Sequence, residues 1–172
     1  YLSRSINLIL GNRVSAIDKE KKEVTAQDGS IHPYDILVMA TGSAPFVPPI
    51  PGSDKKGVFV YRTIEDLDGM KAHAPHAERG AVIGGGLLGL EAAKAMLDLG
   101  ISDTQVIEFA PRLMPRQIDD RGSAVLQAKL ETLGLKIRTS TNTSEIAGNG
   151  CIEAMKFADG TIMENVAFED IQ

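Results

Sequence analysis

The sequence of 172 residues has only one cysteine, Cys151, and no tryptophan. A single thiol cannot form an internal disulfide, a Cys-x-x-Cys redox pair or a four-cysteine iron–sulfur site. Such scarcity is typical of proteins in a reducing compartment, and we expect the chain to be cytoplasmic. Any electron chemistry in which this chain takes part must therefore use a bound organic cofactor.

The chain also lacks an excess of basic residues and a long hydrophobic run. Lysine and arginine number 18 against 23 aspartates and glutamates, giving a net charge of −5 and an isoelectric point near 5.2. A mildly acidic chain lacks the basic surface with which proteins bind nucleic acids or anionic membranes. The longest apolar stretch, residues 81–90, contains four glycines and ends before Glu91. We therefore expect no membrane span and find no signal peptide.

Signals of metal or hydrolase chemistry are missing as well. His73 and His76 have a three-residue spacing, but Pro75 interrupts it and no cysteine or carboxylate cluster is adjacent. The pattern, like His32 alone, predicts exposed loop residues rather than a metal site. No G-x-S-x-G or H-E-x-x-H string occurs, so nothing in the sequence supports nucleophilic or metal-dependent hydrolysis.

The first part of the chain has the pattern of short β-strands. Residues 14–17 and 24–26 are strand candidates around a charged turn, residues 18–23, which we interpret as a solvent-exposed hairpin tip. Asp28-Gly29 predicts a second tight turn. Residues 36–40 form a continuous apolar run, which is typical of a strand buried on both faces of a sheet.

Residues 44–52 contain four of the chain's eight prolines: Pro45, Pro48, Pro49 and Pro51. The segment could be a P-x-x-P ligand. A stiff connector is favoured, because proline fixes φ and resists both helix and sheet. We therefore divide the chain into a partial, β-rich domain over residues 1–52 and a second domain over residues 53–172.

The second domain alternates strands with helices, which predicts an α/β fold of the Rossmann-like type, with a doubly wound parallel sheet. Thr63 and Asp66 have the spacing of a capping box. Asn149-Gly150 and Asp159-Gly160 separate three short strand-like pieces, which indicates an antiparallel β-meander. The expected strands are residues 58–61, 81–83, 104–109 and 135–138. The expected helices begin at Thr63, after the glycine loop of residues 84–89, and at Asp119 or Asp120, with Gly100 and Gly134 ending the last two.

Residues 84–89 read GGGLLG and match the pattern G-x-G-x-x-G. The pattern alone is weak, but here it follows a predicted strand and opens a predicted helix. Gly84 would allow a tight turn, Gly86 would let a pyrophosphate approach the backbone, and Gly89 would let the helix pack closely on the sheet. The free amides of the first helical turn, at Leu87 and Leu88, would favour a phosphate anion.

Glu108 ends the next predicted strand, 19 residues after Gly89, close to the spacing of the dinucleotide-binding fingerprint. Its carboxylate could accept hydrogen bonds from the adenosine ribose hydroxyls and would repel a 2′-phosphate, so NADH is favoured over NADPH. Arg112 and Arg116 lie nearby and could soften that preference. Glu91, early in the helix, has two readings: compensation of the helix dipole, or contact with the nicotinamide side of the cofactor.

Three strings carry a family resemblance: residues 61–67 (YRTIEDL), 84–93 (GGGLLGLEAA) and 108–114 (EFAPRLM). Together they resemble the large subunit of assimilatory or cytoplasmic NAD(P)H-dependent nitrite reductases, within the flavoproteins that have two dinucleotide-binding domains. Residues 34–43 (YDILVMATGS) resemble the second flavin-binding segment of those flavoproteins. The resemblance extends from about residue 10 to about residue 168. It implies that residues 1–52 are a partial FAD-binding domain and residues 53–172 an NAD(P)H-binding domain.

The resemblance implies a role in which this chain binds NAD(P)H and presents hydride to FAD for the reduction of nitrite to ammonia. It implies that Thr41 and Gly42 approach FAD in the intact protein. Sirohaem and an iron–sulfur cluster are expected only outside this chain, and the rest of the reductase, with a small subunit, is the expected partner. The first flavin motif is missing, so we expect a piece of the enzyme that is not competent in nitrite reduction. No catalytic residue is assigned.

Two alternatives share these motifs. One is an NADH-dependent ferredoxin or rubredoxin reductase, which passes electrons to a separate small protein and needs no sirohaem. The other is a nucleotide-binding module without enzymatic activity.

Overall fold

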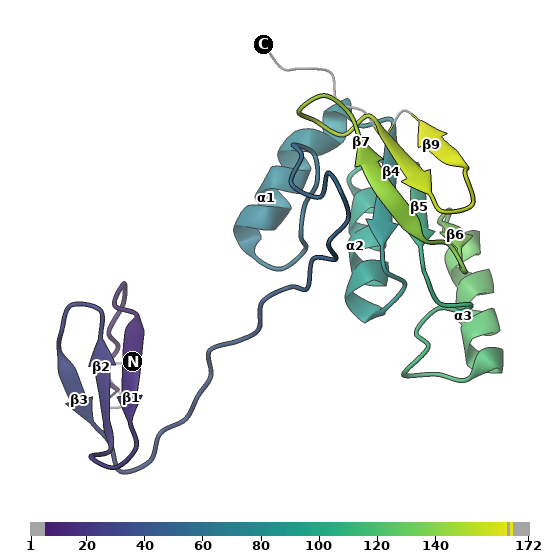
Figure 1. Ribbon diagram of the computed structural model, residues 1–172. Coiled ribbons are helices and arrows are strands. Elements are labelled where there is room, and N and C mark those ends of the chain that lie inside the picture. Colours follow the sequence, from purple (N-terminus) through teal and green to yellow (C-terminus); the bar gives the residue numbers. More distant parts are fainter. Residues whose placement is uncertain (1–5, 165, 167–172) are drawn as a thin grey trace. The chain divides into compact units, whose positions relative to one another are not determined.

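The computed structural model describes residues 6–164 and residue 166. The chain forms two compact units, residues 1–43 and 44–172 (Figure 1). This division falls after Ser43, and the boundary of the cofactor-binding domains that we place after residue 52 stays a prediction.

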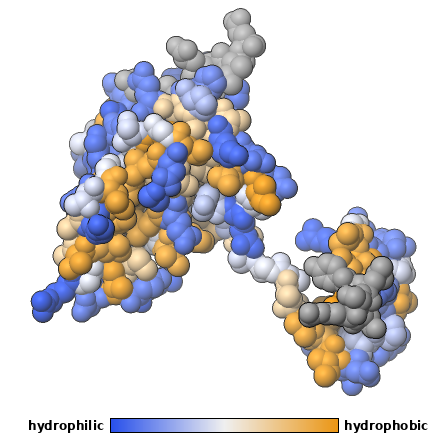
Figure 2. Space-filling view, turned by 180° about the vertical axis from the view of Figure 1, so that it is seen from behind, coloured by the Kyte–Doolittle hydropathy of each residue, from blue (hydrophilic) through white to orange (hydrophobic). Residues whose placement is uncertain are grey.

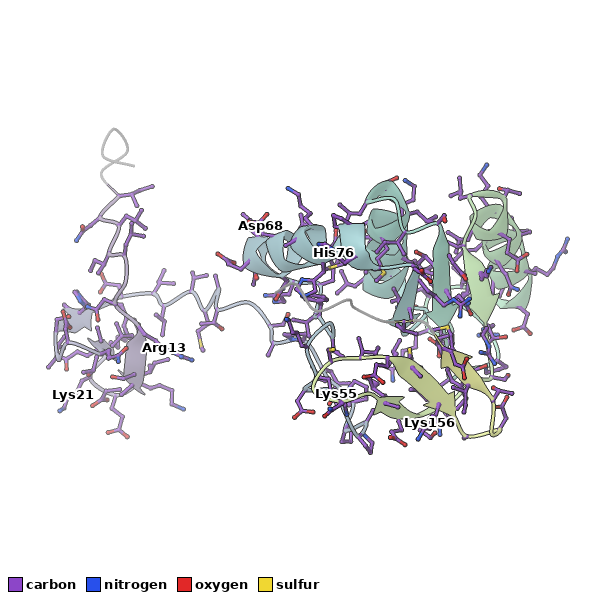
Figure 3. All side chains as sticks on the ribbon, turned by 90° about the horizontal axis from the view of Figure 1, so that it is seen from above. Arg13, Lys21, Lys55, Asp68, His76 and Lys156 are labelled. Carbon is purple, nitrogen blue, oxygen red and sulfur yellow. The ribbon has the colours of Figure 1, made fainter. Side chains whose placement is uncertain are left out.

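The first unit is a three-stranded antiparallel sheet of β1 (Val14–Asp18), β2 (Glu23–Ala26) and β3 (Ile31–Pro33). The β1–β2 turn is held by Asp18, whose Oδ1 accepts hydrogen bonds from the N–H groups of Glu20 and Lys21 at 3.0 and 2.9 Å. Lys21, labelled in Figure 3, is an exposed residue of this turn. The predicted hairpin is therefore confirmed, and β3 adds a strand that we did not predict.

The apolar run over residues 36–40 is not a strand, so that prediction is wrong. Ile36 and Val38 are 85% and 80% exposed. A strand buried on both faces needs neighbouring strands and covering layers, and no described strand pairs with this run. Apolar residues thus remain on the surface of this unit, and apolar patches are visible on both units in Figure 2.

The second unit is built on a parallel sheet in the order β4-β5-β6, formed by β4 (Arg79–Ile83), β5 (Asp103–Ile107) and β6 (Lys136–Arg138). The connections are α2 (Leu87–Asp98) and α3 (Asp120–Thr132) (Figure 1). This strand–helix alternation confirms the predicted α/β fold with its parallel sheet.

Adjacent residues of the central strand β5 serve two different hydrophobic cores. Val106 is fully buried among residues of the helices and their loops, and Ile107 is 1% exposed on the opposite face. Alternate side chains of a strand point to opposite faces, so this sheet is covered on both sides. The helix-side core contains Leu90, Ala93, Val106, Leu113 and Leu135; the other contains Ile107, Ile146, Ile152, Met155, Phe157, Met163 and Val166.

The second face is covered by an antiparallel meander of β7 (Thr143–Ala147), β8 (Ala154–Phe157) and β9 (Ile162–Glu164), in that order. The three predicted strand-like pieces and their antiparallel pairing are confirmed. Arg138 at the end of β6 lies over the ring of Phe157, 4.3 Å from its centroid.

The helix α1 (Ile64–His73) begins as predicted: Thr63 Oγ1 accepts from the N–H of Asp66, and Asp66 accepts from the N–H of Thr63. The 3₁₀ turn η2 (Ala74–His76) follows and contains Pro75. His73 Nδ1 lies 2.9 Å from the carbonyl oxygen of Gly69. None of the helices among the described residues has the length and apolar character needed to cross a bilayer.

The strand predicted over residues 58–61 is absent. Val58 instead closes a turn, donating its N–H to the carbonyl of Lys55 at 3.2 Å, and packs against the meander core. The proline-containing segment before it is also bonded to the meander: the N–H of Ile146 in β7 donates to the carbonyl of Pro51 at 2.8 Å. Lys55, labelled in Figure 3, donates in turn to the carbonyl of Ile146.

Candidate functional site

The glycine-rich loop connects β4 to α2 at the carboxyl ends of the parallel strands, where open α/β sheets bind their ligands. Gly84 has φ of +116°, a conformation that side chains disfavour, and its N–H donates to the carbonyl of Ile107 at 2.8 Å. The chain thus turns sharply at the end of β4, beside the end of β5, and enters the helix. Gly86 is the N-cap residue of α2.

The last two glycines of the pattern have different surroundings. A Cβ atom on Gly89 would lie 2.0 Å from the carbonyl oxygen of Gly84, so the helix can lie this close to the loop only with glycine there. A Cβ on Gly86 would meet no protein atom within 4 Å. The packing of this protein therefore requires Gly89, whereas Gly86 leaves space that a ligand can use.

The amino end of α2 has no side-chain cap, in contrast to α1 and α3. Thr63 caps α1 and Asp119 caps α3, so of the two predicted caps for α3 the structure has Asp119. The first N–H groups of a helix have no intrahelical partner, and the helix dipole places partial positive charge on them. Leu87 and Leu88 are largely exposed at this end. The arrangement suits an anion held by backbone amides.

Glu108 follows β5 and is hydrogen-bonded to the glycine-rich loop. Its Oε2 accepts from the N–H of Gly85 at 2.5 Å, and its Oε1 accepts from the N–H of Ala110 at 2.6 Å. The side chain is half-buried, and each carboxylate oxygen retains a lone pair for another donor. Glu108 is thus fixed in position beside the loop before any ligand arrives.

The segment that follows Glu108 returns to the same glycine. Met114 donates its N–H to the carbonyl of Gly85 at 2.9 Å. Leu113 is fully buried, and its Cδ2 would lie 2.6 Å from a Cβ on Gly85. Sequence reasoning missed this role of Gly85, because the pattern leaves its second position free. The run of three glycines was the available signal.

The two arginines near Glu108 differ in their surroundings. Arg112 forms an ion pair with Asp120 at the start of α3, and its Nη2 donates to the carbonyl of Pro115 at 3.0 Å. Arg116 is exposed. Arg112, the arginine nearer to Glu108 in the sequence, is therefore already paired with Asp120.

A cavity of about 520 Å³ adjoins the loop. Its walls include the residues that follow the three parallel strands: Gly84 after β4, Glu108 and Phe109 after β5, and residues 141–143 after β6. The segment with the prolines closes it at Phe46, Pro48, Pro49 and Ile50. The cavity thus lies at the carboxyl ends of the parallel strands, and Glu108 is part of its wall.

The remaining predicted site residues are Glu91 in the second unit and Thr41 and Gly42 in the first. Glu91 is exposed on α2, one turn beyond Leu87. Thr41 and Gly42 belong to the first unit, where both are exposed and Gly42 has φ of +72°. Among the described residues, no group of three or more histidine, cysteine, aspartate or glutamate side chains could hold a metal ion.

A parallel sheet, a glycine-rich turn into an uncapped helix and an acidic residue after the next strand are the features with which Rossmann-type proteins bind dinucleotides. The sequence matches the pyridine nucleotide-disulphide oxidoreductase family over residues 1–167. The chain belongs to that family.

Individual relatives agree with the resemblance seen in the sequence. The chain is 48% identical over 167 residues to the large subunit of nitrite reductase (NADH) from Escherichia coli, covering 95% of this chain and 20% of the relative. Nitrite reductase [NAD(P)H] from Bacillus subtilis is 46% identical, with the same two coverages. The chain thus spans about a fifth of the length of these curated relatives.

Solved structures share the fold. A ferredoxin reductase from Rhodopseudomonas palustris superposes with a TM-score of 0.86 at 26% identity, covering 95% of this chain and 40% of the other. A water-forming NADH oxidase from Lactobacillus brevis bound to NADH superposes with 0.74 at 26% identity, covering 90% and 35%. An engineered form of that oxidase, bound to NADPH, has lost an aspartate and gained two arginines.

Proposed function

We propose that this chain is the NAD(P)H-binding part of a flavoprotein nitrite reductase. The whole enzyme reduces nitrite to ammonia. The observation that carries the proposal is the joint presence of the uncapped glycine-rich turn and the fixed Glu108 carboxylate in a chain 48% identical to a nitrite reductase large subunit. The activity belongs to the whole protein, since the chain spans a fifth of such relatives.

The residues present fit a dinucleotide. The pyrophosphate lies against the amino end of α2, at Leu87 and Leu88, where Gly86 leaves open space and Gly84 and Gly89 shape the turn. Glu108 accepts hydrogen bonds from the 2′- and 3′-hydroxyls of the adenosine ribose through its free lone pairs. NADH, when bound, supplies a hydride for FAD. Glu91 lies on the nicotinamide side.

Glu108 also sets the preference for NADH. A carboxylate that already faces the ribose repels a 2′-phosphate at short range, and Arg112 is engaged by Asp120. The oxidase engineered to NADPH, which lost an acid and gained arginines, supports the same electrostatic reasoning. NADPH is the weaker alternative substrate, with Arg116 the cation left to bind it.

The other redox groups of a nitrite reductase do not fit this chain. One cysteine cannot supply the several thiolates that hold an iron–sulfur cluster. We place those groups in other parts of the enzyme. We further propose that a small subunit is a partner of the enzyme. Thr41 and Gly42 contact FAD in the intact, soluble cytoplasmic protein.

A second candidate is an NADH-dependent ferredoxin or rubredoxin reductase, which the superposition on a ferredoxin reductase favours. Activity assays on the whole protein that contains this chain distinguish the two candidates. We expect NADH-dependent consumption of nitrite with formation of ammonia; reduction of an added ferredoxin without nitrite consumption favours the second candidate.

Calorimetric titration of the chain with NADH and NADPH tests the nucleotide site itself. We expect tighter binding of NADH and loss of that preference in Glu108→Ala. Equal affinity of the unaltered chain for both nucleotides would contradict the role of Glu108. Absence of binding of either nucleotide would contradict the proposed site.

A further inference from the structure

We propose that Asp120 determines nucleotide specificity without touching the nucleotide. By holding the guanidinium group of Arg112, Asp120 withholds from a 2′-phosphate the cation best placed to bind it. The inference rests on the proposed nucleotide site, and it assigns the selectivity for NADH to two acidic residues rather than to Glu108 alone.

The first step concerns the place of Arg112. The segment from Glu108 to Met114 touches Gly85 at both ends, through the carboxylate of Glu108 and through the N–H of Met114. Leu113, the neighbour of Arg112, is buried against the same glycine. Arg112 therefore sits in a short loop closed on the residue that Glu108 contacts, near the ribose hydroxyl that carries the phosphate in NADPH.

The second step concerns what Arg112 bonds to now. Its Nη1 donates to Oδ1 of Asp120 and its Nη2 to the carbonyl of Pro115. Its Nε is buried and, among the described residues, has no hydrogen-bond partner. A guanidinium binds a phosphate best through two parallel N–H donors. Each terminal nitrogen gives one N–H to Asp120 or Pro115, so a phosphate must compete with the Asp120 carboxylate for the positive charge of Arg112.

The third step concerns why Asp120 can be changed alone. Its side chain is 87% exposed, whereas that of Arg112 is 33% exposed. The helix α3 is capped by the preceding residue, Asp119, whose Oδ1 accepts from the N–H of Gly122 at 2.8 Å. Asp120 is thus dispensable for the cap and the core. Its replacement frees Arg112 and removes one negative charge from the surroundings of a 2′-phosphate.

The test compares two ligands that differ by the phosphate, 5′-AMP and 2′,5′-ADP, by calorimetry on the full chain. In Asp120→Asn we expect 2′,5′-ADP to bind about tenfold more tightly, the gain of one charge-assisted hydrogen bond. The affinity for 5′-AMP should stay unchanged. NADPH and NADH should follow the same pattern. Asp98→Asn, which removes an equal charge from the exposed pair with Lys94 on α2, is the matched control and should change neither affinity.

The double variant Arg112→Gln with Asp120→Asn identifies the cation. We expect it to lose the gain for 2′,5′-ADP while it still binds 5′-AMP. A gain that persists in the double variant, or no gain in Asp120→Asn, would overturn the role of Asp120. If the unaltered chain binds 5′-AMP and NADH, such a failure leaves the proposed function standing. Absence of any nucleotide binding would overturn both.

Discussion

The carboxylate of Glu108 accepts a hydrogen bond from the backbone N–H of Gly85, with Oε2 and N 2.5 Å apart. The residue that is to select the ribose thus also holds the loop that is to bind the pyrophosphate. A ligand reaching this site meets a loop that is already in place, and preorganisation of this kind lowers the entropic cost of binding.

Replacement of Glu108 should therefore loosen the empty loop as well as weaken NADH binding. In Glu108→Gln, one of the two acceptor oxygens becomes an NH₂ group, which leaves the N–H of Gly85 or Ala110 without an acceptor. We expect faster hydrogen exchange at that amide in the absence of nucleotide, by about tenfold, equivalent to about 1.4 kcal/mol. Unchanged exchange at Gly85 and Ala110 would show that Glu108 does not order the loop.

The two glycines Gly86 and Gly89 should separate binding from stability. Gly86→Ala places a methyl group in open space, so we expect an unchanged melting temperature and weaker binding of NADH and NADPH alike. Gly89→Ala drives a methyl group onto the Gly84 carbonyl, so we expect destabilisation by about 1–3 kcal/mol. Thermal denaturation and calorimetry on both variants check this, and equal melting temperatures for the two would contradict it.

Asp103 at the start of β5 should make stability depend on pH. Hydrogen bonds from Lys136 and Arg79 lower the pKa of its carboxyl to about 2. Because the pKa is lower in the folded chain, the stabilisation is present above the unfolded value near 4 and is lost as pH falls toward 2. Asp103→Asn should thus be less stable than the unaltered chain at pH 7, and the gap should close near pH 2. A gap that stays constant between these pH values would contradict the expectation.

Local signals predicted most of the second unit. Thr63 with Asp66, Asp119 before α3, and the glycine turn into α2 each act through bonds to nearby backbone, so the sequence alone contains them. The runs over residues 36–40 and 58–61 failed because a strand also needs a partner, and partners are set by tertiary structure. The contact of Gly85 with Leu113 escaped for the same reason, since it joins residues far apart in the chain.

Titration of the isotope-labelled chain with NADH, followed by amide chemical shifts, tests the central claim most directly. The account predicts saturable shifts at residues 84–90 and at Glu108 and Ala110, which surround the proposed pyrophosphate and ribose positions. Residues 14–33, the β-sheet of the first unit, should show none. Saturation without shifts at residues 84–90, or no saturable shifts at all, would contradict the assignment of this loop as the nucleotide site.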